Sequence, residues 1–178
     1  MDGGLIARRY ATVLYDFGVS KDSTELIYAD ANKICAAFKE TPEALEFFCS
    51  PLKKVHEKKD LIKSAFGNVV SPATTDFLLF VADKNRISMI DEILRVYQIV
   101  YKERNDIHTA EVTTARALSA EKCSELTQLL EKKVGAKVDA KFKTDERIIG
   151  GVIICIDGKQ VDCSISRQLA DIEKSLTV

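Results

Sequence analysis

The sequence predicts an α+β protein with two domains: an N-terminal six-helix bundle over residues 1–105, and a small mixed-sheet domain with two helices over residues 106–178. The period of the apolar residues predicts both parts. Up to about residue 104 they recur at intervals of three and four, as in amphipathic helices. After the segment KERND (102–106) they alternate with polar residues, as in a strand with one buried face.

Residues typical of helix N-termini divide the first domain into helices. Thr41 before Pro42, and Ser71 before Pro72, each combine a side-chain acceptor at the N-cap with a preset φ at the first helical position. Ser88, with an acidic residue three positions later, resembles a weak capping box. The connections are short, so neighbouring helices should pack antiparallel. The expected helices cover residues 3–18, 22–39, 42–48, 54–66, 72–84 and 88–104.

The second domain combines strands and helices. In KVDAKFK (137–143), Val138, Ala140 and Phe142 alternate with charged residues, which predicts a strand. A weaker strand is expected over HTAEVTTA (108–115), and helices are expected from about 119 to 134 and from about 166 to 176.

The segment IIGGVIICIDGKQVDCS (148–164) predicts a hairpin. Residues 152–156 are all apolar, which suits a strand covered on both faces, and Asp157-Gly158 is a preferred type I′ turn pair. Gly150 and Gly151 run into this strand, where a bulge or a close backbone approach is the usual reason for glycine. A phosphate cradle needs glycines that run into a helix, so that interpretation fails.

Composition argues against several functional classes. The net charge of −1, from 26 basic and 27 acidic residues, gives no uniform field for holding nucleic acid. The five cysteines and two histidines lack the paired spacing of a zinc site, so we expect no metal and no cofactor. Neither His56 nor His108 lies in a sheltered context for acid–base catalysis, and we expect no catalytic residues. The lysine-rich run LKKVHEKKDLIK (52–63) is interpreted as a helix with a solvated basic face, although a phosphate-binding strip is an alternative.

Two helices carry more apolar surface than one core-facing stripe requires. The first has Ile6, Tyr10, Val13 and Phe17 on one side, with Ala7, Ala11, Leu14 and Tyr15 continuing round it. The fifth has an unbroken apolar run over residues 77–81. Either both helices are central in the bundle, or they leave an apolar groove for a partner helix.

Several fragments, in their order and spacing, resemble one protein family over nearly the whole chain. They are RRYATVLYDF, FFCSPLKKVHEKKDLIKSAF, FLLFVADKNRISMIDEILRVYQIVYKE, VTTARALS and DERIIGGVIICIDGKQVDCSISRQLADIEKSL. Together they resemble the delta subunit of rotary ATP synthases, whose mitochondrial counterpart is called oligomycin-sensitivity conferring protein.

The resemblance implies a non-catalytic stator subunit, present in one copy per complex. It implies that the N-terminal domain binds an N-terminal helix of an alpha subunit between the first and fifth helices, and that the C-terminal domain binds b-type subunits of the peripheral stalk. Positions 149, 152 and 169 are carried over as stalk contacts, namely Ile149, Val152 and Leu169. The groove positions implied are Tyr10, Val13, Leu14, Phe17, Phe77, Phe80 and Val81.

The sequence also bears on location and on rival functions. No apolar run approaches the ~18 residues of a spanning helix, and the N-terminus lacks the pattern of a signal peptide, so no direct membrane insertion is expected. The resemblance implies a protein peripheral to the bacterial inner membrane on its cytoplasmic side, or at the equivalent organellar face. The alternative function is a helical adaptor of another assembly, ahead of an enzyme and of a nucleic-acid-binding protein.

Overall fold

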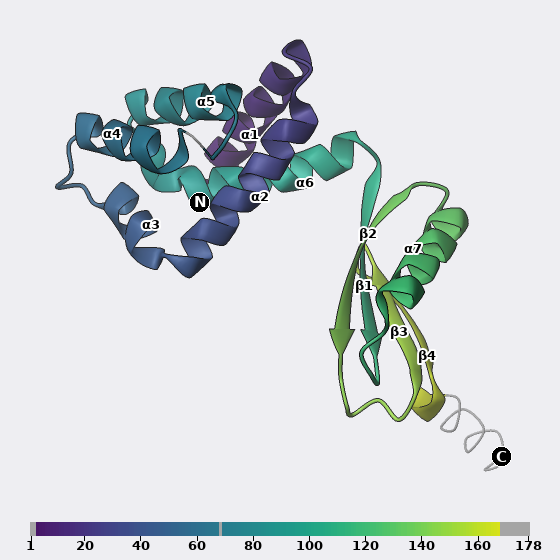
Figure 1. Ribbon diagram of the computed structural model, residues 1–178. Helices are drawn as coiled ribbons and strands as arrows, with labels where there is room; N and C mark the ends of the chain where they lie inside the picture. Colours follow the sequence, from purple (N-terminus) through teal and green to yellow (C-terminus); the bar gives the residue numbers. More distant parts are fainter. Residues whose placement is uncertain (1–2, 68, 168–178) are drawn as a thin grey trace. The chain divides into compact units, whose positions relative to one another are not determined.

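The computed structural model describes residues 3–67 and 69–167 of the chain. The chain forms two compact units, Met1–Lys102 and Glu103–Val178 (Figure 1). The first unit is helical and the second combines a helix with a four-stranded sheet. The prediction of a mixed α+β chain is therefore confirmed.

The described part of the first unit consists of helices joined by short connections. Their apolar stripes face one core, which includes Ile27, Ile34, Ile93, Leu94 and Tyr97, each at most 1% exposed. The hydroxyl of Tyr97 also donates a hydrogen bond to the carbonyl of Thr24 at 3.2 Å, so the polar group of this buried side chain has a partner. The elements are α1 (Gly3–Ser20), α2 (Thr24–Glu40), α3 (Pro42–Cys49), α4 (Val55–Phe66), α5 (Pro72–Asp83), the 3-10 helix η1 (Ile87–Met89) and α6 (Ile90–Arg104).

Of the three predicted N-caps, one forms its side-chain hydrogen bond. The hydroxyl of Ser71 accepts the backbone N–H of Thr74 at 3.4 Å and so caps α5. Thr41 occupies the N-cap position of α3 with Pro42 after it, as predicted, but its side chain makes no cap bond, and its backbone N–H ends α2 on Ala37. The prediction for Ser88 is wrong, because this residue lies within η1 and α6 begins after it.

One lysine of the lysine-rich helix α4 is buried rather than solvated. Lys58 is buried, with only 6% of its surface exposed, and its Nζ donates to the carbonyl of Phe48 at 2.7 Å. The carbonyl is one of the last in α3, where helix carbonyls lack intrahelical partners and favour a cation. The lysine therefore ties α4 to α3, which the expectation of a solvated face did not include.

The second unit is a mixed sheet with a helix packed on one face. Strand β1 (Ile107–Thr114) pairs in parallel with β2 (Lys137–Thr144), and the connection between them contains α7 (Ala120–Val134). Strand β3 (Gly151–Ile156) is antiparallel to β1 and to β4 (Lys159–Ser164), which gives the order β2-β1-β3-β4. The buried core residues are Ala110, Val112, Leu130 and Val138.

The predicted hairpin is present between β3 and β4. Asp157 and Gly158 have φ of 47° and 83°, the positive values that a type I′ turn requires. The expectation that both faces of β3 are covered is wrong for the described residues. Residues 152–156 are all only half-buried: Val152, Ile154 and Ile156 pack on the core beneath α7, and Ile153 and Cys155, which alternate with them, do not belong to that core. Residues 165–167 have helical backbone, at the start of the range where a second helix was expected, and the rest of that range lies outside the described residues.

Candidate partner-binding groove

Helix α1 packs on the bundle through one face, made of small side chains and Leu14. Ala7, Ala11 and Leu14 are all 0% exposed. At Gly18, which continues this face, an added Cβ would lie 3.1 Å from side chains of α2. Small residues on this face let the helix backbone approach closely. Tyr10, Val13 and Phe17 lie on the neighbouring face, beside α5.

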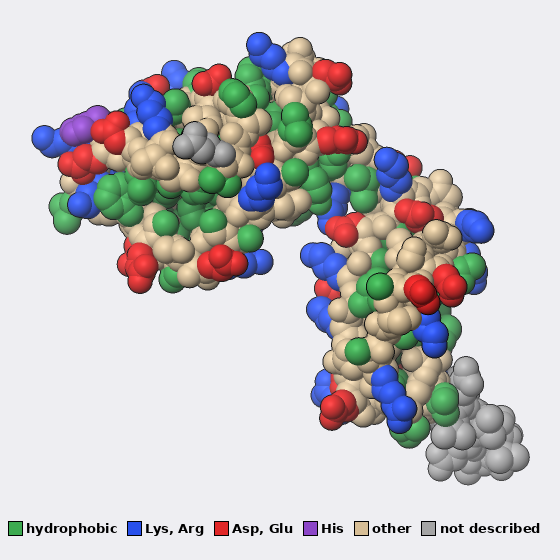
Figure 2. Space-filling model, viewed as in Figure 1, with side chains coloured by type: hydrophobic (Ala, Val, Ile, Leu, Met, Phe, Trp, Pro, Cys, Tyr) green, Lys and Arg blue, Asp and Glu red, His purple; other side chains and the backbone are tan. Residues whose placement is uncertain are grey.

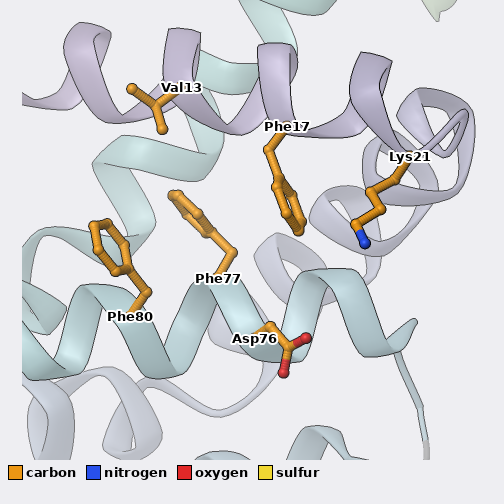
Figure 3. Close-up of a pocket in the computed structure, with 6 residues that line it drawn as sticks. All are labelled: Val13, Phe17, Lys21, Asp76, Phe77 and Phe80. Atoms are coloured by element: carbon orange, nitrogen blue, oxygen red, sulfur yellow. The ribbon is translucent and has the colours of Figure 1, made fainter.

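Large side chains of α1 and α5 line two adjoining hollows, which together we call the α1–α5 groove. Figure 3 shows the first hollow, where Val13, Phe17, Phe77 and Phe80 point into the space between the two helices. Its volume is about 440 Å³, and Lys21 and Asp76 complete its lining. The second, of about 400 Å³, is lined by Ile6, Arg9, Tyr10, Val13, Phe80 and Arg86. Val13 and Phe80 line both hollows, which are therefore continuous.

The walls of the groove expose apolar surface and its floor does not. Val13 is 49% exposed and Phe80 is 44% exposed, whereas Phe77 is 5% exposed. The rings of Tyr10 and Phe80 face each other across the groove with centroids 6.4 Å apart and planes tilted by 47°. Lys84 lies over the Phe80 ring at 5.6 Å, within range of a cation–π contact.

The structure divides the seven expected groove residues into two groups. Those that line the groove are Tyr10, Val13, Phe17, Phe77 and Phe80. Leu14 and Val81 do not line it, because both are 0% exposed and belong to the core behind α1 and α5. Their assignment as partner contacts is corrected accordingly: they support the groove from beneath.

Charged residues at the two ends of the groove were missed by the sequence analysis. Arg9 lies one helical turn before Val13, and Lys21 lies one turn after Phe17, so helical spacing alone could have indicated both. Asp76 directly precedes Phe77. Arg86 follows the end of α5, after Asn85 turns the chain with a φ of 53°, and no periodic pattern marks it.

A buried carboxylate fixes the start of α5. Asp30 of α2 is 5% exposed, and its Oδ2 accepts the backbone N–H of Ser71 at 2.7 Å and the hydroxyl of Thr74 at 3.0 Å. A negative charge at a helix N-terminus is favourable, and the two hydrogen bonds tie the start of α5 to α2. The position of the α5 wall therefore depends on a residue outside the groove.

The second unit has a hollow of its own at one end of the sheet. Its volume is about 430 Å³, and Ile149 and Val152 line it together with Leu118 and Leu126. Ile149 is 73% exposed. Gly151 shapes this end, because its φ of +84° and its close approach to the backbone of Cys163 leave no room for a side chain. Leu169, the third expected stalk contact, lies outside the described residues.

The pKa shifts of Cys35, His108 and Asp157 have causes within the fold. Burial raises the pKa of the Cys35 thiol, which keeps it protonated in the core. A hydrogen bond from His108 to the hairpin carboxylate of Asp157 raises the pKa of the histidine and lowers that of the aspartate. Within residues 3–67 and 69–167, no cluster of three His, Cys, Asp or Glu side chains could hold a metal ion. On the face seen in Figure 2, charges of both signs are interspersed.

A helical unit with an open apolar groove, followed by a small α+β unit with a second apolar hollow, is the architecture of a protein that binds other proteins. The family model described as ATP synthase delta (OSCP) subunit matches residues 6–176. The chain belongs to this family, which confirms the resemblance seen in the sequence, and it is a non-catalytic structural subunit of the ATP synthase.

Individual relatives agree with this assignment. The chain is 33% identical over 173 residues to an ATP synthase subunit delta of Desulforamulus reducens, covering 97% of this chain and 96% of the relative. It is 32% identical over 176 residues to an ATP synthase subunit delta of Chlorobaculum tepidum, covering 99% and 97%.

The fold also matches that of a solved structure. A chain in the cryo-EM structure of the Toxoplasma gondii mitochondrial ATP synthase hexamer superposes with a TM-score of 0.68 and 20% identity, covering 97% of each chain. None of the helices in the described ranges is long and apolar enough to cross a membrane.

Proposed function

We propose that this subunit links the catalytic alpha/beta head of the ATP synthase to the b-type subunits of its peripheral stalk. In this proposal α1–α6 form a six-helix bundle that binds the head, and the α1–α5 groove receives an N-terminal helix of one alpha subunit. The observation that carries the proposal is the groove itself, since Val13 and Phe80 leave about half of their surface exposed beside an apolar floor. Such a surface fits the apolar face of an amphipathic helix.

The second unit contacts the stalk in this proposal. Its support is the apolar hollow around Ile149 and Val152, because a largely exposed isoleucine next to an open hollow favours a protein contact. The expected second helix of this unit, with Leu169, remains part of the proposal. One copy serves each complex, and its place at the membrane, on the bacterial cytoplasmic side or the organellar equivalent, follows from the subunits that it binds.

The physical task of the link is to resist torque. Rotation of the central rotor drags the head with it unless the head is held, and a head that turns with the rotor makes no ATP. A holding contact requires slow dissociation more than chemistry. Two moderate contacts on one chain achieve this together, because binding at one raises the effective concentration at the other.

A binding experiment with a matched control tests the proposal. Phe80→Asp places a charge in the groove wall, and Leu26→Asp places one at an apolar residue of α2 that is 60% exposed and lies outside the groove. Heads lacking the delta subunit should bind the wild-type chain and the Leu26 variant, but not the Phe80 variant, with equal helix content in all three by circular dichroism. Equal binding of the two variants, or no binding of the wild-type chain, contradicts the proposed function.

A further inference from the structure

The two ends of the α1–α5 groove differ in charge. Arg9 and Arg86 line the hollow at one end, and both are exposed. At the other end Lys21 and Asp76 line the hollow, and their formal charges cancel. The formal charge of the lining is therefore +2 at the Arg9 end and zero at the Lys21 end.

The two guanidinium groups are available to a partner. Neither Arg9 nor Arg86 forms an ion pair or a side-chain hydrogen bond with another residue of the described ranges 3–67 and 69–167. The acidic residue closest to them along α5, Asp83, is paired with Lys59 of α4. A helix that docks over this end removes water from both arginines.

Loss of water makes the charge of the partner decisive. A buried or half-buried guanidinium without a counter-charge is unfavourable, so an apolar or basic segment at this end would weaken docking. A carboxylate there can accept two parallel N–H bonds from an arginine, and this geometry also fixes orientation. The aromatic floor of the groove carries no such directional information.

We infer that the partner helix carries carboxylate side chains at the end that lies against Arg9 and Arg86, and that these arginines select the partner and set its direction in the groove. This inference rests on the proposed function, since it describes the helix that the groove receives. From Arg9 to Lys21 the groove follows α1 for about 18 Å, at 1.5 Å per residue. The partner therefore lays about three helical turns in the groove, with apolar residues three and four apart and its acidic residues at one end.

Calorimetric titration of the full chain with a synthetic N-terminal peptide of the alpha subunit tests this inference. The chains are wild type, the double variant Arg9→Gln/Arg86→Gln, and Lys63→Gln as a control on α4, where an exposed cation lines neither hollow. A second peptide has its Glu and Asp residues replaced by Gln and Asn. Since the substituted side chains are exposed, all chains should melt at the same temperature.

At low salt the double variant should bind the native peptide about three- to tenfold more weakly than wild type does, and the Lys63 variant should bind as wild type does. The difference should shrink at high salt, because exposed charges are screened, and should vanish with the amidated peptide. Equal affinity and equal salt dependence of wild type and the double variant overturn the inference while leaving the proposed function standing. Absence of any binding to the wild-type chain, or dimerisation of the chain through this groove, overturns both.

Discussion

Truncation of Phe80 should weaken partner binding and leave the stability of the fold nearly unchanged. Truncation of Phe77 should mainly lower the stability of the fold. The two rings lie on the same helix and line the same hollow, but Phe80 is 44% exposed and Phe77 is 5% exposed. The exposed part of a groove side chain is what a partner can bury. The buried part already stabilises the bundle.

The exposed fractions set the magnitudes. Full burial of a phenylalanine side chain is worth up to about 3 kcal/mol, so burial of the remaining 44% of Phe80 contributes about 1.3 kcal/mol. Phe80→Ala should thus raise the dissociation constant about tenfold. Phe77→Ala removes a core ring and should lower the free energy of unfolding by about 3–5 kcal/mol, against roughly 1–2 kcal/mol for Phe80→Ala.

Urea denaturation measures the stability of each variant, and titration with the alpha-subunit peptide measures its affinity. Leu26→Ala is the matched control, since this residue is 60% exposed on α2 and lines neither hollow of the groove. It should change neither quantity by more than a few tenths of a kcal/mol. If Phe80→Ala binds as Leu26→Ala does, or unfolds as easily as Phe77→Ala, the assignment of Phe80 to an open groove wall is wrong.

Three further predictions concern groups outside the groove. Asp30→Ala should lower the free energy of unfolding by about 2–4 kcal/mol in urea, because it removes the acceptor of two hydrogen bonds at the start of α5, and Asp30→Asn should cost less. His108→Gln should destabilise the chain at pH 5.5 but not at pH 9. Because the pKa of His108 is raised in the folded chain, its pair with Asp157 stabilises the fold below about pH 6.5, and this stabilisation is lost as the pH rises through the folded pKa of His108. It is also lost in acid, as the pH falls through the lowered pKa of Asp157. Equal destabilisation at both pH values would contradict this. A maleimide should label exposed Cys163 in the native chain well before Cys35, which burial keeps protonated, and equal labelling rates would show that the core opens more readily than its packing indicates.

The period of apolar residues predicted most of the elements because each element buries one face. The stripe of α6 that contains Ile93, Leu94 and Tyr97 is fully buried, and the alternating residues of β2 face the core beneath α7. The turn at Asp157 was predictable because its backbone requirement is local to two residues.

Periodicity could not decide which face of α1 turns inward. Hydrophobicity alone favours the larger side chains as the core, yet Ala7 and Ala11 are buried and Tyr10 and Val13 line the groove. Close helix packing selects small residues, and that selection depends on the neighbouring helix. The burial of Lys58 could not be predicted from periodicity either, because it depends on an acceptor carbonyl in another helix.

The candidate site was predictable as a surplus of apolar surface on two helices, but its charges were not. Arg9 and Arg86 are far apart in the chain and meet only because α1 and the segment after α5 line one hollow. The exclusion of Leu14 and Val81 from that lining also required the packed structure.

Nuclear magnetic resonance of the isotope-labelled full chain, titrated with the alpha-subunit N-terminal peptide, tests whether the α1–α5 groove receives this helix. We expect saturable shifts at groove residues of α1 and α5, including Val13, Phe17 and Phe80, with residues 103–178 unchanged. Shifts confined to residues 103–178, or a peptide that leaves α1 and α5 unperturbed at saturating concentration, would contradict it.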